Sequence, residues 1–311
     1  MRVMVCELDA DGGRLEAGWA RVVGHAHRYG PELAVLPELP FAPWLPATDD
    51  VDPEAWADAV AAHDRWLERL PELRATVVVA SRPTVVDGHR FNEGFVWVAG
   101  EGIVGGRTKT FLPDEAGFHE ATWYQRGPVR FDPVPTPLGQ IGVLLCTELW
   151  FPEHARALGQ AGVGLLAAPR ATPFESRHRW EAVARVDAIT AGAYLLTANR
   201  SGRAGPTRLG GGSWVVDPDG EVLARTTRGT PAVTVEVDLA RARAARSASP
   251  RYVDDRPRGD GAPRRSSPAP AVRPPHQVAR WHDERVSLRH PTRPAGVSRH
   301  GDLAATTRPT A

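Results

Sequence analysis

The stretch Ile141-Gly142-Val143-Leu144-Leu145-Cys146-Thr147-Glu148-Leu149-Trp150-Phe151-Pro152-Glu153 contains the change of pattern that decides the fold. Its first five residues are typical of a buried strand, and a helical pattern begins at its end. Cys146 therefore stands at a strand-to-helix turn, where we expect it to be exposed at the edge of a sheet. Backbone N–H groups near a helix start favour a thiolate and, later, an oxyanion. The alternative is a small buried hydrophobic residue, as most free cysteines are.

The same alternation of short apolar runs and amphipathic stretches extends to about residue 250. Apolar residues at three- and four-residue spacing predict helices over Leu15–Tyr29, Pro53–Leu70, Glu153–Ala161 and Arg177–Ala191. Short apolar runs predict strands over Val3–Leu8, Leu33–Leu36, Thr76–Ser81, Phe91–Ala99, Ile141–Leu145, Leu165–Ala168, Tyr194–Ala198, Gly212–Val216 and Ala232–Val237. This order favours an α/β or α+β fold with helices outside the sheets. Because no repeat or proline-rich break interrupts it, we expect a single domain over residues 1–255.

Residues 256–311 have a different composition. They hold 11 arginines against four acidic residues, nine of the 29 prolines, and no hydrophobic period. We expect a mostly disordered tail. An arginine-rich tail can contact nucleic acid or an anionic surface, but a solvated extension is the favoured interpretation, so nucleic acid is not an expected partner.

Length and composition exclude several classes of protein. A chain of 311 residues with 42% hydrophobic content can bury a large core. No apolar run approaches the roughly 18–20 residues that cross a bilayer, and the N-terminus lacks a secretory pattern. The two cysteines, Cys6 and Cys146, form no disulfide framework and no cluster with metal-ligand spacing. We therefore expect a cytoplasmic globular protein that has no metal and no membrane association.

Two charged residues stand out. Lys109 is the only lysine among 38 lysines and arginines. An ammonium is a compact point charge that fits beside a reacting carbonyl oxygen, whereas a guanidinium is planar and forked; codon bias is the alternative explanation. Glu38 follows the apolar run Leu33–Leu36, where apolar neighbours raise a carboxyl pKa and suit it to general-base chemistry. Taken alone, such a glutamate is more often a solvated loop charge.

Together these segments resemble the nitrilase superfamily, the carbon–nitrogen hydrolases. The resemblance rests on Glu38 in Leu-Pro-Glu-Leu, Lys109 in Arg-Thr-Lys-Thr-Phe-Leu-Pro-Asp-Glu, and Cys146 in Leu-Leu-Cys-Thr-Glu-Leu-Trp-Phe-Pro-Glu, in the order and at the intervals of that family. It covers about residues 1–255. It implies a four-layer αββα sandwich and a cysteine hydrolase of non-peptide C–N bonds. It also implies a homodimer or larger homo-oligomer that needs no metal or organic cofactor.

The resemblance also implies roles for particular residues. Glu38 would take the proton of Cys146, whose thiolate forms a covalent intermediate with the substrate. Lys109 and the backbone N–H of Thr147 would stabilise the oxyanion. Glu120 matches a second glutamate that positions substrate in related amidases; the alternative is a structural partner of Lys109.

The substrate is less well defined. Trp150-Phe151-Pro152-Glu153 resembles the N-carbamoylputrescine amidase type, so we expect a small linear amide or N-carbamoyl compound. Tyr124 and Trp150 are candidate walls of the pocket, with plain core packing as the alternative. Arg170 or Arg179 is a candidate partner for a substrate carboxylate, and an internal salt bridge is the alternative.

Three other functions stay open: two enzymatic activities and one without catalysis. A true nitrilase, which releases acid from a nitrile, uses the same three residues, and so does a transferase that passes the acyl group to an amine. A catalytically silent relative kept for binding or assembly is the third. The intact set of Glu38, Lys109 and Cys146 argues against the silent relative.

Overall fold

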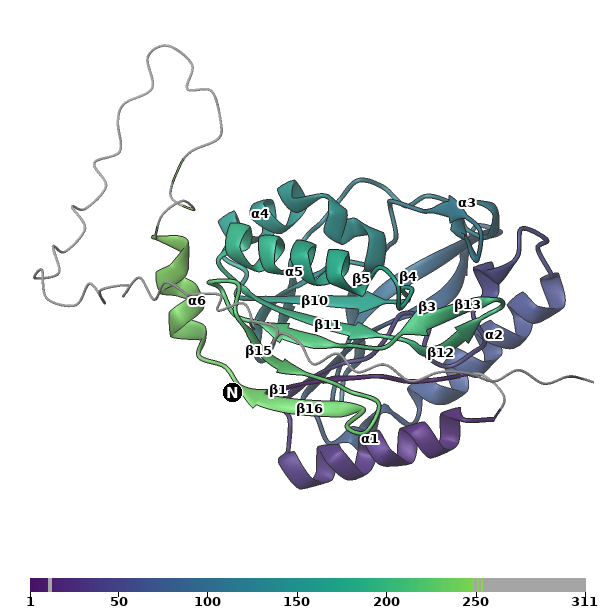
Figure 1. Cartoon of the computed structure of the whole chain (residues 1–311), viewed down its shortest axis with the longest axis horizontal. Helices are drawn as coiled ribbons and strands as arrows, with labels where there is room; N and C mark the ends of the chain where they lie inside the picture. Colours follow the sequence, from purple (N-terminus) through teal and green to yellow (C-terminus); the bar gives the residue numbers. More distant parts are fainter. Residues whose placement is uncertain (11–12, 249–250, 252, 254–311) are drawn as a thin grey trace, which may run out of the picture. The chain divides into compact units, whose positions relative to one another are not determined.

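Figure 1 shows the computed structural model of the chain, in which residues 1–10, 13–248, 251 and 253 are described. Two six-stranded sheets form the centre of the described part. The first has the order β16-β1-β2-β3-β4-β5, and its strands are β1 (Arg2–Cys6), β2 (Leu33–Val35), β3 (Val77–Val86), β4 (His89–Val98), β5 (Gly102–Thr108) and β16 (Ala232–Glu236). The second has the order β15-β14-β11-β10-β9-β8, and its strands are β8 (Val134–Thr136), β9 (Gly139–Val143), β10 (Leu165–Arg170), β11 (Tyr194–Asn199), β14 (Trp214–Val216) and β15 (Val222–Arg225).

The two sheets pack face to face over one apolar core. In the first sheet, parallel pairing places Val3, Leu33 and Val77 side by side. In the second sheet, Leu165 pairs with Tyr194. All five residues belong to the same buried cluster, because side chains alternate along a strand and this register points one set at the facing sheet.

Helices cover the outer faces of both sheets (Figure 1). Trp19 of α1 (Leu15–Tyr29) and residues of α2 (Pro53–Leu67) pack with Met4 on the outer face of the first sheet. Residues of α4 (Pro152–Gln160) and α5 (Arg177–Ala191) pack with Leu166 on the outer face of the second. The order helix, sheet, sheet, helix confirms the predicted αββα sandwich.

Helix ends follow local chemistry. The predicted bounds of α1 and α5 are confirmed, and each helix stops at a left-handed glycine, Gly30 (φ 54°) and Gly192 (φ 62°). The helix predicted over Pro53–Leu70 ends instead at Leu67, and Leu70–Leu73 forms a separate 3₁₀ turn. Pro71 accounts for the break, since the residue before a proline disfavours the helical conformation.

Several short elements were not predicted. They are β5, β8 and β15, the hairpins β6 (Asp114–Glu115) with β7 (Phe118–His119) and β12 (Ser201–Ala204) with β13 (Thr207–Gly210), the helices α3 (Glu120–Trp123) and α6 (Leu239–Arg246), and the 3₁₀ turns Leu45–Ala47 and Cys146–Trp150. Three glycines in β5 hide its alternation, and the other strands are too short to show a period.

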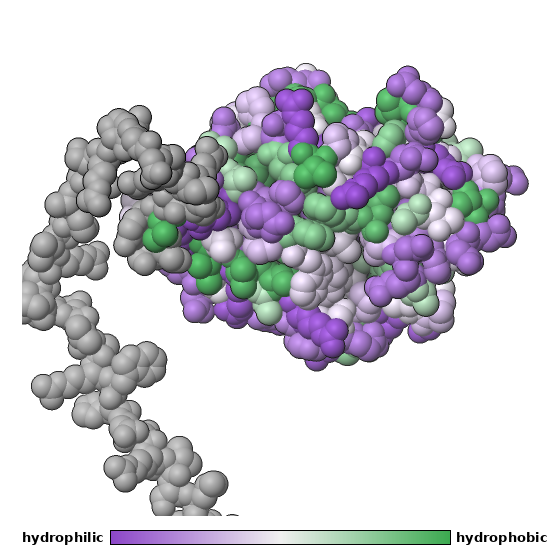
Figure 2. All heavy atoms as spheres, turned by 90° about the horizontal axis from the view of Figure 1, so that it is seen from above, coloured by the Kyte–Doolittle hydropathy of each residue, from purple (hydrophilic) through white to green (hydrophobic). Residues whose placement is uncertain are grey.

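The predicted tail over residues 256–311 lies outside the described residues, so the boundary at residue 255 stays a prediction. No helix of the described part is long and apolar enough to cross a membrane. Figure 2 looks onto the side of α4 and α5, where apolar side chains lie among polar ones. Val186 of α5 is 45% exposed.

Asp187 of α5 is a buried acid whose loss of hydration is not offset by hydrogen bonds from the described residues. Both of its carboxylate oxygens are buried and lack a hydrogen-bond partner among the described residues. Burial raises the pKa of Asp187 to about 8, and the charge of Glu153 adds to the rise. The folded state therefore binds the proton more tightly than the unfolded chain, and stability falls as pH rises from the ordinary value of 3.8 towards 8.

Replacing Asp187 with asparagine removes this titration. We expect the stability advantage of Asp187→Asn to grow between pH 5 and pH 8, by up to about 1.4 kcal/mol per pH unit. Thermal unfolding at several pH values measures it, with Asp58→Asn on the exposed side of α2 as the control. Parallel curves for wild type and Asp187→Asn across this range would contradict the interpretation.

Candidate active site

Strand ends from both sheets bring the predicted residues together. Glu38 follows β2 and Lys109 follows β5 in the first sheet, whereas Cys146 follows β9 in the second. Lys109 Nζ donates to Glu38 Oε1 at 2.8 Å, and all three side chains are buried. The charges of Glu38 and Lys109 both act on the Cys146 thiol. The spacing in the sequence thus corresponds to one buried cluster.

The backbone around Glu38 is fixed on both sides. Pro37 has no N–H and stops the pairing of β2, and the N–H of Glu38 instead donates to the carbonyl oxygen of Arg170 at the end of β10 (3.2 Å). Leu39 takes a left-handed conformation (φ 44°), and its carbonyl oxygen accepts a hydrogen bond from Arg200. Such a conformation is costly for leucine and persists because neighbouring contacts determine it.

Lys109 is held at its backbone as firmly as at its side chain. Its N–H donates to the carbonyl oxygen of Asn92, and its own carbonyl oxygen accepts from the N–H of Gly127, both at 2.8 Å. A Cβ atom at position 127 would lie 2.5 Å from the carbonyl oxygen of Thr108. Only glycine allows this approach, so Gly127 helps to set the position of Lys109.

The ammonium bridges two carboxylates. Lys109 Nζ lies 2.7 Å from each oxygen of Glu120 and 2.8 Å from Glu38 Oε1. Asn92 Nδ2 donates to the same Oε1 atom at 2.8 Å. The other oxygen, Glu38 Oε2, is buried without a hydrogen-bond partner in the described part of the chain. One oxygen is therefore fixed and the other is available to accept a proton.

Burial and mutual charge set the protonation states. Burial alone would lower the pKa of Lys109, but Glu120, Glu38 and Cys146 raise it by more, so the ammonium stays charged. Burial raises the pKa of Glu120 above its ordinary value, although the charge of Lys109 opposes the rise. Burial and then Glu38 raise the pKa of the Cys146 thiol. The thiol is thus protonated at neutral pH and needs a base to become a nucleophile.

The expectation that Cys146 is exposed was wrong. Its side chain is 3% exposed and packs with Leu144, Leu149 and Trp180 of the outer core beside the second sheet. The backbone of Cys146 is left-handed (φ 46°) at the start of the turn Cys146–Trp150, and Sγ lies 3.7 Å from the carbonyl oxygen of Ala171. A strained non-glycine residue at a strand end is typical of a nucleophile held in one orientation.

Glu148 is a positioning residue that the sequence did not identify. Its fully buried carboxylate accepts from the N–H of Thr110 and the N–H of Leu145, each at 2.7 Å, and pairs with Arg107. Thr110 follows Lys109 and Leu145 precedes Cys146, so one side chain ties the two loops together. A glutamate within the apolar run after Cys146 was the available signal.

Asn92 also escaped sequence analysis, because its contact with Glu38 depends on β3 pairing with both β2 and β4.

The other predicted side chains lie around the cluster in different ways. Thr147 Oγ1 donates to the carbonyl oxygen of Phe111. Tyr124 is buried against Trp56, and its hydroxyl lacks a partner among the described residues. Trp150 is 43% exposed and packs edge-on against Trp180, with ring centroids 5.3 Å apart.

Arg170 is fully buried and engaged by neutral oxygens. Its terminal nitrogens donate to Thr172 Oγ1 (3.0 Å), Thr197 Oγ1 (3.1 Å) and the carbonyl oxygen of Gly212 (3.0 Å). The guanidinium lies over the ring of Trp214 at 4.4 Å. Burial lowers the pKa of Arg170 to about 10, which leaves it charged at neutral pH. It forms no ion pair with a described carboxylate, so the expected internal salt bridge is not found there.

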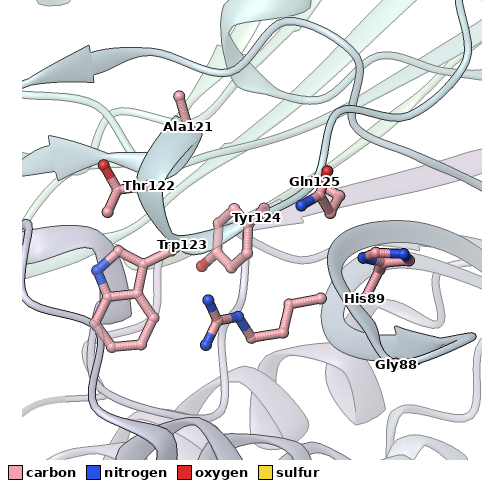
Figure 3. A pocket seen from close by; sticks show the side chains of 8 residues that line it. Gly88, His89, Ala121, Thr122, Trp123, Tyr124 and Gln125 are labelled. Carbon is pink, nitrogen blue, oxygen red and sulfur yellow. The ribbon is translucent and has the colours of Figure 1, made fainter.

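A cavity of about 380 Å³ adjoins the segment that directly follows Glu120 (Figure 3). It is lined by Gly88–Arg90 and Ala121–Gln125 and not by Glu38, Lys109 or Cys146. Figure 3 shows the side chains of Trp123 and Tyr124 extending to the same side of their segment. Tyr124 thus belongs to this cavity and also to the surroundings of Glu120 and Glu38, whose charges, after burial, raise its pKa. Among the described residues, no group of three or more histidine, cysteine or acidic side chains is placed to hold a metal ion.

Comparison with known proteins places this geometry in a family. The sequence model described as "Carbon-nitrogen hydrolase" matches residues 12–247. The chain belongs to the carbon–nitrogen hydrolase family. A solved carbon–nitrogen hydrolase from Helicobacter pylori G27 superposes with a TM-score of 0.70 at 25% identity, covering 81% of this chain and 94% of that one.

Curated relatives match over shorter stretches. The chain is 34% identical over 130 residues to deaminated glutathione amidase of Mus musculus. The matched stretch covers 41% of this chain and 40% of that protein. It is 30% identical over 165 residues to N-carbamoylputrescine amidase of Arabidopsis thaliana. This match covers 48% of the chain and 55% of that protein. The matches therefore span about half or less of these relatives.

Glu148→Gln tests the connection between the two loops. We expect a loss of about 3–5 kcal/mol in the free energy of unfolding, since one amide oxygen cannot replace a carboxylate that accepts from three groups and balances a buried charge. Urea denaturation measures the loss. Glu175→Gln, at an exposed position, serves as the control and should change stability by less than about 0.5 kcal/mol. Equal effects of the two substitutions would show that Glu148 is not a structural tie.

Glu120→Gln tests the electrostatic balance around the thiol. Glu120 raises the pKa of Cys146, so removal of its charge should shift the pH profile of Cys146 alkylation downward, by about one pH unit. Iodoacetamide labelling in a Cys6→Ala background gives the profile. Glu115→Gln, exposed on β6, is the matched control. An unchanged or upward-shifted midpoint for Glu120→Gln would oppose the assignment.

Proposed function

We propose that this chain hydrolyses a non-peptide C–N bond of a small linear amide or N-carbamoyl compound through a thioester at Cys146. The observation that carries the proposal is the hydrogen bonding of the Glu38 carboxylate. Lys109 and Asn92 hold its Oε1 atom, while its Oε2 atom is buried without a partner in the described structure, near a thiol that is protonated at neutral pH. A general base and a nucleophile that needs one are therefore present in one water-poor cluster.

In the first half-reaction, Cys146 Sγ attacks the carbonyl carbon as its proton passes to Glu38 Oε2. The carbonyl oxygen becomes an oxyanion, which the Lys109 ammonium and the N–H of Thr147 stabilise. Thr147 is the second residue of the turn Cys146–Trp150, and the first amides of a helical turn have no acceptor within it. When the tetrahedral intermediate collapses, the C–N bond breaks, and Glu38 returns its proton to the leaving ammonia or amine.

In the second half-reaction, water replaces the leaving group. Glu38 removes a proton from the water molecule, whose oxygen attacks the thioester carbon. The C–S bond then breaks, the carboxylic acid departs, and Glu38 returns the proton to the thiolate. Each proton that Glu38 accepts is released in the next step, so this sequence balances without a redox partner or a metal ion.

Glu120 and Tyr124 complete the proposed site. The two short contacts from Glu120 keep Lys109 charged and aimed at the base, and in addition Glu120 positions substrate. The buried, unpartnered hydroxyl of Tyr124 is a candidate hydrogen-bond partner for the substrate within the described cluster. Thr147, Trp150 and Arg170 stay predictions as substrate-binding residues; the terminal nitrogens of Arg170 already donate within the protein.

Amides are favoured over nitriles because both curated relatives described above carry amidase names. A nitrilase, an acyl transferase and a silent relative remain the alternatives. A homo-oligomer and a cytoplasmic location also remain proposals. The exposed Trp150 and Val186 are apolar surface that an oligomer would cover.

Ammonia release from a panel of aliphatic amides, N-carbamoyl amines, N-carbamoyl amino acids and nitriles tests the function. We expect one amide or N-carbamoyl class to react, and Cys146→Ala and Glu38→Gln to lower its rate by at least about 10³-fold. Mass spectrometry of the enzyme quenched during turnover should show the acyl group of the thioester intermediate on Cys146.

Cys6→Ala is the matched control, because Cys6 is the other buried cysteine and should leave the rate unchanged. Turnover of nitriles alone would replace the proposal with a nitrilase. Silence across the panel, with no acyl adduct on Cys146, would favour the non-catalytic relative.

A further inference from the structure

A second cavity of about 1150 Å³ is lined by residues at the ends of β1, β13 and β15 and by residues of α1. Seven arginines line it, against two acidic residues, Glu7 and Asp9. None of Glu38, Lys109, Glu120 and Cys146 is among its lining residues. The cavity is therefore separate from the site described above, and its lining is strongly basic.

The two acidic residues are already engaged. Glu7 Oε1 accepts from the N–H of Gly212 at 2.8 Å and from the hydroxyl of Thr226. Asp9 pairs with Arg14 at 2.5 Å. Another lining arginine, Arg225, pairs with Glu181 at 2.6 Å. Ion pairs with described carboxylates thus account for Arg14 and Arg225 among the seven lining arginines.

Four of the lining arginines, Arg21, Arg177, Arg208 and Arg228, form no ion pair within the described part of the chain. Arg177 and Arg208 lie over the same ring, that of Phe174, with guanidinium carbons 4.2 Å and 4.0 Å from its centroid. Phe174 thus brings two guanidinium groups, both of which are hydrogen-bond donors, to one part of the cavity lining.

Trp214 adds a donor without an acceptor. It is buried and lines the cavity, and its indole Nε1 atom lacks a hydrogen-bond partner among the residues described. Buried donors are nearly always satisfied, so an orphan at a cavity wall indicates a missing acceptor. Guanidinium groups and an indole N–H all donate, and together they match a ligand that is rich in acceptors and negative charge.

We propose that this cavity binds a small molecule that carries two or more anionic groups, either phosphates or carboxylates. Its volume of about 1150 Å³ slightly exceeds the usual range for small-ligand pockets, about 300–1000 Å³, so it has room for such a molecule. Arginine forks bind both oxyanion types in a bidentate manner. Arg177 and Arg208 hold one anionic group at Phe174, and Arg21 and Arg228 hold another. This binding does not depend on the proposed hydrolase activity.

Calorimetric titration of the full chain with inorganic pyrophosphate and with citrate, at constant ionic strength, tests the proposal. We expect saturable binding of at least one anion and a rise of Tm with its concentration. The tighter of the two identifies the preferred anionic group. Acetate, with a single charge, and sucrose, with none, should not saturate the site.

The double substitution Arg177→Gln and Arg208→Gln should weaken the affinity by at least about tenfold. The matched control, Arg65→Gln with Arg243→Gln, removes the same charge from exposed positions outside the cavity and should leave the affinity unchanged. Arg228→Gln alone provides a second variant that disturbs no ion pair in the described structure.

Two results would overturn the proposal. One is the absence of saturable binding of both pyrophosphate and citrate to the wild-type chain. The other is an equal loss of affinity in the cavity variants and in the control pair, which would indicate attraction to net charge and not a site.

Discussion

The buried contact of Lys109 with Glu38 and Glu120 is the constraint on which the rest of the structure depends. Each ion taken out of water costs several kcal/mol, and only short, well-aligned contacts offset that cost. The distances of 2.7–2.8 Å around Nζ meet this requirement. They hold only because the backbone of Lys109 is fixed by Asn92 and Gly127, and that of Glu38 by Arg170. The sheets, the loops and the glycine positions hold these three side chains at those distances.

The site also depends on the sandwich having two sheets. Glu38 and Lys109 come from the first sheet, and Cys146 comes from the second. Within the cluster, Glu148 joins the loop after β5 to the loop after β9 by accepting from the N–H groups of Thr110 and Leu145. Left-handed backbone at Leu39 and Cys146 turns each chain at its strand end. The strain at these two residues and the buried charges are both compensated by packing further from the site.

Much of the fold was predictable because its signals are local. The helices α1 and α5 show a clear period and end at glycines, and most of the strands of the core are continuous apolar runs. In the site, Glu38 and Cys146 were recognisable because each follows such a run, and Lys109 because it is the only lysine of the chain. The contacts of Asn92 and Glu148 were not predictable, since they depend on strand pairing and on loops distant in the sequence. The burial of Cys146 escaped prediction for the same reason: Trp180, which covers it, lies on a later helix.

The division of the site between two sheets has a mechanical consequence. Hydrogen bonds fix distances within a sheet, but the separation between sheets depends on the volume of the side chains between them, here those of Val3, Leu33, Val77, Leu165 and their neighbours. Compression of this apolar layer would bring the proposed base Glu38 and the proposed nucleophile Cys146 closer without breaking a strand pairing. The thickness of the core therefore sets the distance between Glu38 and Cys146. Hydrostatic pressure or the loss of one methylene group from the core would change that distance.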